Sequence, residues 1–226
     1  MKTSNKLLIA LFTVGLLTLI GANLALKAEH DKIDFNDPFY GLSVRNIKPF
    51  RVLKLEGNNA GLLSVQTGPS SEIRLSDKEK DLFTFRSQGD TLLVSYKPKE
   101  VHWHPYANMY FDAQPAAIIL TPTLTALYTD QVSCNLKRFQ ADNLTIWQQH
   151  GGVLISNSAI GNLTVTDSRG SELHTKPDNR IGRATITSRD SSLFIVERDV
   201  FGALSLQTDS LATVKMPGSL LGKIKP

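Results

Sequence analysis

Short runs of alternating apolar and polar residues recur along most of this chain. From residue 47 onward, no stretch of 12 or more residues keeps the 3.6-residue apolar period of an amphipathic helix. Residues two positions apart on a strand point to the same face, so each run predicts a strand with one buried face. In the C-terminal half the runs begin at Leu124, Cys134, Leu144, Leu154, Leu163, Leu173, Ala184, Phe194, Leu204 and Val214. The pattern predicts an all-β domain.

The spacing of these runs is regular. The two runs of a pair begin ten residues apart, and the pairs repeat after 19 to 21 residues. Matching residues accompany the repeat, at Asp130-Gln131, Asp167-Ser168, Asp190-Ser191 and Asp209-Ser210, and at Ile160-Gly161, Ile181-Gly182 and Phe201-Gly202. We therefore predict a single-stranded parallel β-helix, or β-solenoid, with rungs of about 20 residues. The alternative is an antiparallel sandwich, which has similar strand spacing but no reason to repeat its turn residues.

Residues 47–115 carry the same pattern in part. Apolar residues again recur every ten positions, at Leu53, Leu63, Ile73, Phe83 and Leu93. This spacing predicts that the stack of strands begins near residue 47. The pattern is lost between residues 97 and 115, and we expect that segment to leave the stack as an excursion.

The start of the chain is strongly apolar. Leu7–Leu26 is twenty residues long and holds no charged side chain. A helix of that length spans about 30 Å, the thickness of the hydrocarbon core of a bilayer. A cleaved signal peptide is the alternative, but its apolar region is usually shorter and ends in a small-x-small cleavage site. We therefore predict an uncleaved membrane anchor over residues 1–27, followed by a polar stalk at 28–46 and the β-solenoid domain at 47–226.

Charge indicates the orientation and the class of partner. Lys2 and Lys6 precede the apolar helix, so the positive-inside rule predicts a single-pass protein of the cell membrane with its C-terminal domain outside the cytoplasm, in the periplasm. The net charge is +4, and Lys2, Lys6 and Lys27 all precede Glu29, the first acidic residue of the chain. The nearly neutral remainder lacks a basic surface for phosphates, so no nucleic-acid partner is expected.

Residues after the stalk suggest a family. An apolar and glycine pattern runs through Phe50, Leu53, Leu55 and Gly57, then Leu63, Val65 and Gly68, then Gly89 and Leu92. In this pattern the chain resembles the head GIN domain family, adhesin-like, membrane-anchored proteins of the Bacteroidetes type. The Gly-Ile-Asn that names the domain is absent, and Gly57-Asn58-Asn59 stands in its place. The resemblance implies a β-solenoid at the cell envelope and brings no catalytic residues.

The excursion concentrates the residues that favour binding. It contains His102, Trp103, His104, Tyr106, Tyr110 and Phe111. Long loops that leave a regular scaffold often carry function, and exposed aromatic residues mark binding sites. We predict a binding surface here. Two histidines alone fall short of the three or four ligands of a metal site, so neither a metal nor another cofactor is expected.

Catalytic machinery is not recognisable. Asp167, Asp190 and Asp209 are expected to stack at one edge of adjacent rungs, where acids could bind a cation or act on a polysaccharide. An Asp at a turn more often accepts hydrogen bonds from its own backbone. Cys134, the one cysteine, takes the repeat position that is held elsewhere by Leu154, Leu173, Phe194 and Val214, so it is expected to be buried beside them in the core.

The sequence thus predicts a non-enzymatic, extracytoplasmic interaction module, adhesin-like, with a protein or glycan as partner. Two alternatives stay open. One is a carbohydrate-active β-helix enzyme, which would need several acids converging in a groove. The other is a self-assembling scaffold of the cell envelope, which would need a terminal strand left free to pair edge to edge.

Overall fold

The computed structural model describes residues 2–34, 37, 39–58, 61–97, 111 and 114–225. The chain divides into two compact units, Met1–Gly41 and Leu42–Pro226. The first unit contains helix α1 (Thr3–His30), none of whose residues is buried. By length and composition α1 could cross a membrane, and a signal sequence near an N-terminus passes the same test.

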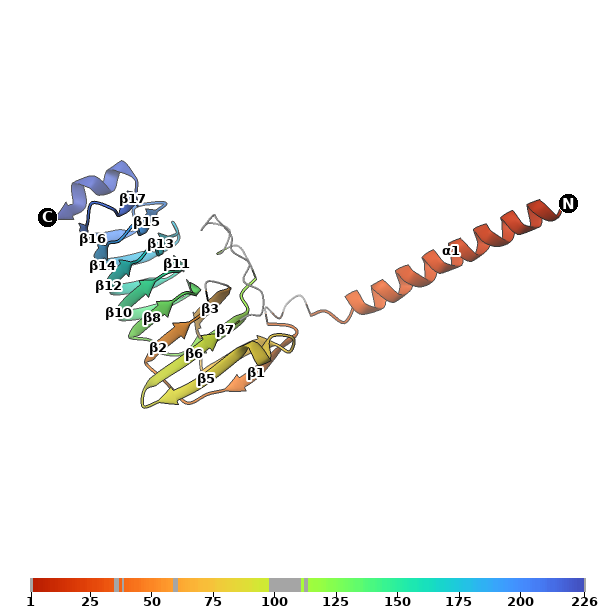
Figure 1. Cartoon of the computed structure of the whole chain (residues 1–226), viewed down its shortest axis with the longest axis horizontal. Coiled ribbons are helices and arrows are strands. Elements are labelled where there is room, and N and C mark those ends of the chain that lie inside the picture. Colours follow the sequence, from red (N-terminus) through yellow and green to blue (C-terminus); the bar gives the residue numbers. More distant parts are fainter. Residues whose placement is uncertain are drawn as a thin grey trace. The chain divides into compact units, whose positions relative to one another are not determined.

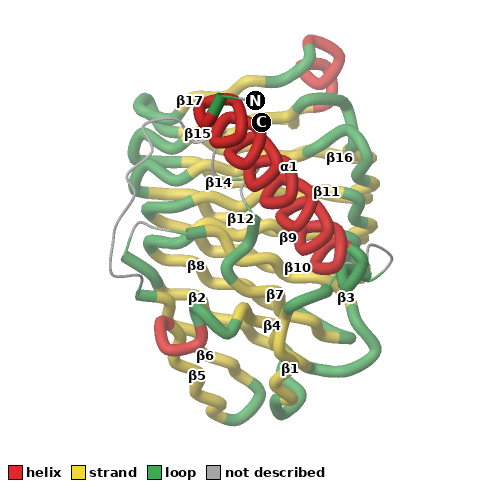
Figure 2. The backbone as a smooth tube through the Cα atoms, turned by 90° about the vertical axis from the view of Figure 1, so that its right-hand side faces the viewer, coloured by secondary structure: helices red, strands yellow, loops and turns green. Residues whose placement is uncertain are grey.

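The second unit is built from two nine-stranded sheets (Figures 1 and 2). Sheet 1 has the order β1 (Leu42–Asn46), β4 (Glu72–Ser76), β7 (Ala117–Thr121), β3 (Leu62–Thr67), β9 (Ser133–Lys137), β11 (Gly152–Ser156), β13 (Glu172–Thr175), β15 (Leu193–Val196) and β17 (Thr213–Lys215). Sheet 2 has the order β18 (Ile224–Lys225), β16 (Phe201–Thr208), β14 (Arg180–Ser188), β12 (Ala159–Ser168), β10 (Gln140–Gln149), β8 (Ala126–Asp130), β2 (Val52–Glu56), β6 (Thr91–Tyr96) and β5 (Phe83–Gln88). Strand β1 falls within the range expected to be stalk. Two short 3-10 helices, η1 (Lys80–Leu82) and η3 (Gly218–Lys223), also belong to the described part of the unit.

The predicted single-stranded parallel β-helix is wrong, because both sheets are mixed. Strands β1, β4 and β7 pair antiparallel in sheet 1, and β5 pairs antiparallel with β6 in sheet 2. Strand β2 lies between β6 and β8, so spatial order departs from chain order. The ten-residue spacing sets the length of a strand and its turn but not the direction of the next strand. Gly89, at φ 60°, forms with Asp90 the two-residue turn that reverses the chain between β5 and β6.

In the C-terminal half the strands pair parallel and keep the predicted period. Leu144, Leu163, Ala184 and Leu204 are successive partners in sheet 2. In sheet 1, however, Cys134 is the partner of Val153 and not of the expected Leu154. A shift of one residue moves a side chain to the opposite face of a sheet.

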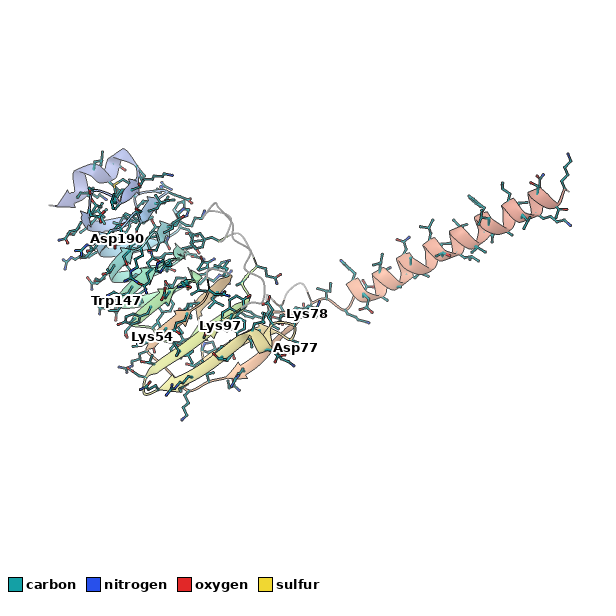
Figure 3. The ribbon with its side chains drawn as sticks, in the orientation of Figure 1. Lys54, Asp77, Lys78, Lys97, Trp147 and Asp190 are labelled. Carbon is teal, nitrogen blue, oxygen red and sulfur yellow. The ribbon has the colours of Figure 1, made fainter. Side chains whose placement is uncertain are left out.

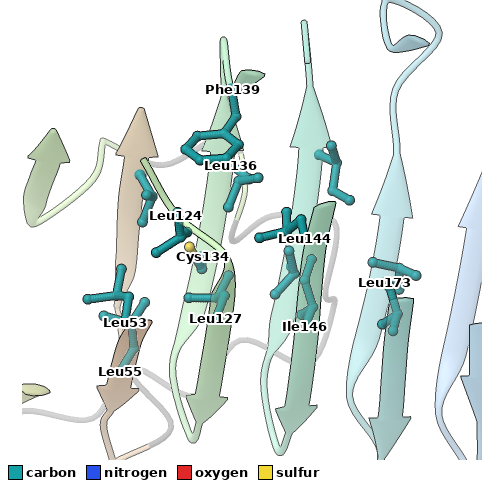
Figure 4. Packing of buried hydrophobic residues seen from close by; sticks show 14 of the residues in the cluster. Leu53, Leu55, Leu124, Leu127, Cys134, Leu136, Phe139, Leu144, Ile146 and Leu173 are labelled. Carbon is teal, nitrogen blue, oxygen red and sulfur yellow. The ribbon is translucent and has the colours of Figure 1, made fainter. Parts of the chain in front are cut away.

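The inward side chains of the two sheets share one core (Figure 4). Cys134 lies in it, fully buried, and burial raises the pKa of its thiol. The expected core position of this residue is confirmed. At the C-terminal end Leu220 of η3 is also fully buried against the core, and at the other end the guanidinium of Arg45 lies 5.1 Å from the ring centre of Phe85.

The recurring glycines lie where neighbouring backbones approach closely. A Cβ on Gly182 would lie 2.6 Å from the carbonyl oxygen of Gly161, and a Cβ on Gly202 would meet Gly182 at the same distance. A side chain there would push adjacent strands apart. Packing of backbone against backbone therefore explains why this position repeats as glycine.

We expect Gly182→Ala to lower the free energy of unfolding by about 1–3 kcal/mol, the usual cost of overpacking. Denaturant unfolding of the purified protein measures it. Gly218→Ala is the matched control, because nothing lies within 4 Å of a Cβ added at Gly218. Equal stability of the two variants would contradict the close approach.

Candidate functional site

Five of the six residues of the predicted binding surface, His102, Trp103, His104, Tyr106 and Tyr110, lie outside the described residues, and for them the prediction stays a prediction. The sixth, Phe111, is only 8% exposed and clusters with Leu62 and Leu154. Its ring meets the ring of His174 edge-on, with centroids 6.3 Å apart. Phe111 thus packs against sheet 1 and is not open to a partner.

A buried polar cluster lies beside Phe111. Because Leu173 points into the core, its neighbours Glu172 and His174 project from the outer face of β13. The Nε2 atom of His174 lies 2.8 Å from Oε1 of Glu197, which also accepts a hydrogen bond from Nζ of Lys176 at 2.7 Å. These contacts hold the imidazole between two acidic residues, since Oε1 of Glu172 lies 3.7 Å from Nδ1.

Glu172 is unusual among the described acids. It is 4% exposed, and within the part of the chain that the structure describes neither carboxylate oxygen has a hydrogen-bond partner. Burial raises the pKa of Glu172 to about 7; Lys215 lowers it and Asp167 raises it further. Glu172, Phe111 and Gly152 line a pocket of about 470 Å³. The carboxylate oxygens themselves are covered, so this pocket offers no open acid.

Asp167 does not stack with Asp190 and Asp209, as the sequence predicted. Its register partners are Gln148 and Ser188, whereas Asp190 follows two residues after Ser188, so the predicted stack of three aspartates is wrong. Asp167 is fully buried and accepts hydrogen bonds from Gln148, Ser171 and Ser188. Burial raises its pKa to about 6, and these three hydrogen bonds oppose the rise.

Asp209 accepts hydrogen bonds from the backbone of its own turn, as the sequence predicted for an Asp at a turn. One carboxylate oxygen accepts hydrogen bonds from the backbone N–H groups of Leu211 and Ala212, each at 2.9 Å. The other accepts one from the N–H of Asp190 at 2.8 Å. These bonds, chiefly the one from Asp190, lower the pKa of Asp209. Among the described residues no group of three or more His, Cys, Asp or Glu side chains is placed to hold a metal ion.

Among the described aromatic residues after Gly41, the exposed one is Trp147, which lies on the outer face of sheet 2. Lys54 of β2, Tyr128 of β8, Trp147 of β10 and Thr166 of β12 are successive register partners. The rings of Tyr128 and Trp147 stack with centroids 4.4 Å apart and planes 8° apart, and Nζ of Lys54 lies 5.3 Å from the Tyr128 ring centre. We call these four residues the aromatic column (Figure 3, where Lys54 and Trp147 are labelled).

The column is open on one side. Tyr128 covers the face of the indole that is directed toward β8, so the other face is directed toward β12, where Thr166 has a short side chain. Trp147 accordingly stays 37% exposed. The next outward positions are Thr187 and Gln207, and a parallel row consists of Thr145, Thr164, Thr185 and Ser205. The free indole face thus borders a flat surface lined with hydroxyl groups.

A depression of about 370 Å³ follows the column. Its lining includes Tyr128, Trp147 and Thr166, and its charged members are Lys54, Glu56 and Asp130. Nδ1 of the neighbouring His150 lies 3.3 Å from Oδ1 of Asp130. The surroundings of the free indole face therefore carry more negative than positive charge when His150 is neutral.

Reasoning from the sequence missed this site. Tyr128 and Trp147 lie on different strands, and each occupies the outward position of its strand, where the pattern predicts a polar residue. The available signal was the repeat itself, because a period of about 20 residues aligns outward positions as well as inward ones. Two aromatic residues at the same outward position of successive strands would have marked the column.

Comparison with known proteins names no family. No family model and no curated protein matches the chain, so the resemblance to the head GIN domain family is not confirmed. Similar solved structures include two described as putative adhesins, from Bacteroides fragilis (17% identity, 79% of this chain and 98% of that chain covered, TM-score 0.45) and Parabacteroides merdae (12%, 79% and 97%, 0.32). Another, from Parabacteroides distasonis, is described as a putative lipid binding protein (11%, 78% and 94%, 0.33). At these identities no function passes to this chain.

The buried acid Glu172 makes a prediction about stability and pH. Its pKa is raised in the folded protein, from 4.5 to about 7, so between these values the folded state holds a proton that the unfolded chain releases. Stability therefore falls as the pH rises through that window and levels off above it. We expect Glu172→Gln to raise the free energy of unfolding at pH 8 by on the order of 2 kcal/mol, with no gain at pH 4.

Denaturant unfolding at the two pH values measures this difference. Glu56→Gln is the control, because Glu56 lies exposed on β2 and should change neither value. A Glu172→Gln variant that loses stability at pH 8 would show that the ionised carboxylate has a partner that stabilises it.

Proposed function

We propose that this chain is a non-enzymatic, adhesin-like binding module of the cell envelope, whose contact surface is the aromatic column. One observation carries the proposal: an indole face is left open, at the end of an ordered stack, on a flat sheet surface. Exposed Trp and Tyr side chains bury a large area on binding at little entropic cost, and they dominate the energy of many interfaces. Toward β16 the outward row continues with Thr166, Thr187 and Gln207, and toward β6 Lys54 separates the two rings from Leu93. The column therefore holds the only aromatic anchor among the described residues of that row.

Helix α1 supports a role at the membrane. It is 28 residues long, and its length and apolar composition would let it cross a membrane. We propose that it is retained as an anchor, with its N-terminus in the cytoplasm and the β-sheet unit in the periplasm, since Lys2 and Lys6 precede the apolar stretch. Such an arrangement would present the aromatic column to partners outside the cytoplasm.

Burial of the perturbed acids counts against a carbohydrate-active enzyme. General acid–base catalysis needs a carboxyl group within hydrogen-bond reach of the substrate. Asp167 is fully enclosed, and the oxygens of Glu172 are covered.

The C-terminal cap counts against a self-assembling scaffold. An end-to-end stack needs open core strands, but Leu220 of η3 is fully buried over the core at that end. Strand β17 is only three residues long, and short edge strands give little template for pairing with another chain.

We expect Trp147→Ala to weaken binding at least about 10-fold, the loss typical of an interface hot spot. The measurement is surface plasmon resonance with the full chain in lipid nanodiscs against a panel of immobilised polysaccharides and extracellular proteins. Leu211→Ala is the control, because Leu211 is an equally apolar, exposed residue away from the column. Trp103→Ala tests the surface predicted from the sequence. Loss with Trp103→Ala but not with Trp147→Ala would move the binding surface to the excursion.

Fractionation of cells tests whether α1 is retained in the mature protein. We expect the protein at full mass in the membrane fraction, extractable with detergent but not with carbonate, because an uncharged 20-residue helix is long enough to span the bilayer. Intact mass spectrometry reads the N-terminus. A mature form that begins near residue 26 or 29 would show that the helix is a cleaved signal.

A further inference from the structure

We infer that the ligand of the aromatic column is a neutral carbohydrate, one sugar ring of which stacks on the face of Trp147 directed toward β12. This inference rests on the proposed function and adds the chemical class of the ligand. It follows from three properties of the column: the width of its apolar surface, the hydroxyl groups beside it and the charge around it.

The open aromatic surface of the column is one ring wide, and Lys54 separates it from Leu93, the outward residue of β6 in the same row. Tyr128 is covered on one side by Nζ of Lys54 and on the other by the indole, so only the face of Trp147 stays open. Beyond it the outward row continues with Thr166, Thr187 and Gln207. A protein partner usually needs several adjoining apolar anchors, whereas a pyranose ring offers one small apolar C–H face of this width.

The rim of the apolar face is made of hydroxyl groups. A hydroxyl both donates and accepts hydrogen bonds, and sugar hydroxyls have the same dual character. Thr166 and Thr187 are register partners on adjacent strands, so they lie about 4.8 Å apart. They can therefore meet successive hydroxyls of a ring that lies against Trp147. The depression of about 370 Å³ is at the lower end of the volumes of ligand pockets, a size for one or two sugar units.

Charge selects a neutral glycan over an acidic one. The charged side chains that line the depression are one lysine, Lys54, and two acids, Glu56 and Asp130. Lys54 is already engaged with the Tyr128 ring. With His150 neutral, a sulfate or uronate group would meet net negative charge. It gains no stabilisation there, because the residues that line the depression include no free cation.

Trp147 itself can report the binding. The chain has two tryptophans, so Trp103→Phe leaves Trp147 as the only one. This full-length variant, in lipid nanodiscs free of glycoside detergent, is titrated with cellotriose, chitotriose, mannotriose and maltotriose while indole emission is followed. We expect a saturable change with at least one of these neutral probes. Dextran sulfate and 3′-sialyllactose, as acidic probes, should give a weaker response.

Two threonine variants test the contribution of the hydroxyl rim. Thr166→Val keeps the shape of the side chain and removes its hydroxyl, so the affinity for the responding probe should fall about 3- to 10-fold. Thr84→Val is the matched control, because Thr84 is exposed on β5, four strands from β10. Equal affinities of these two variants would overturn the assignment.

The outcomes separate this inference from the proposed function. No saturable response to any neutral trisaccharide in folded protein, together with Trp147-dependent binding to a protein of the panel, would overturn the carbohydrate and leave the proposed function standing. Tighter binding of the acidic probes would equally overturn the choice of a neutral sugar. Panel binding that does not depend on Trp147 would overturn the proposed function and the inference together.

Discussion

Parallel, in-register pairing of strands that recur at a regular interval in the sequence is the constraint on which the rest of the β-sheet unit depends. The pairing of β10, β12, β14 and β16 aligns Leu144, Leu163, Ala184 and Leu204 on the inner face. Because inner and outer positions alternate along each strand, the same pairing also aligns the outward residues of neighbouring strands. The core and the aromatic column therefore depend on the same strand register, and a shift of that register by one residue would disrupt both.

Alignment also explains how an aromatic residue is kept ordered on an open surface. An isolated Trp on a sheet has several rotamers, but Trp147 has Tyr128 as its lateral partner, and Tyr128 in turn has Lys54. Each side chain restricts the next, so part of the entropic cost of binding is met before a ligand arrives. On β12 and β14 the outward positions of the same row hold short residues with hydroxyl groups. The change from long to short side chains across neighbouring strands, and not any single residue, creates the open indole face.

The buried polar groups have another role. Asp167, with its hydrogen bonds from Gln148, Ser171 and Ser188, joins three successive turns of the chain, and Glu172 lies on the covered outer face of sheet 1. Raised pKa values often mark catalytic groups, but here burial without access to a substrate explains the values of both acids. Access for a ligand, rather than the size of a pKa shift, distinguishes the surface of sheet 2 from this cluster.

Several features of this protein were determined by local sequence alone. Alternation specified strands, and the repeat placed Cys134 inside the core. The regular period specified which strands of the C-terminal half are neighbours, although it missed the register between Cys134 and Val153 by one residue. Three features needed the tertiary structure. Strand direction in residues 42–96 depends on turns and long-range partners, so β1, β4 and β5 became antiparallel where equal spacing suggested parallel rungs. The burial of Phe111 depends on Leu62 and Leu154, which are distant in sequence. The stacking of Tyr128 on Trp147 depends on the register between β8 and β10, because a polar–apolar pattern records which side of a strand a residue occupies but not which residue lies beside it.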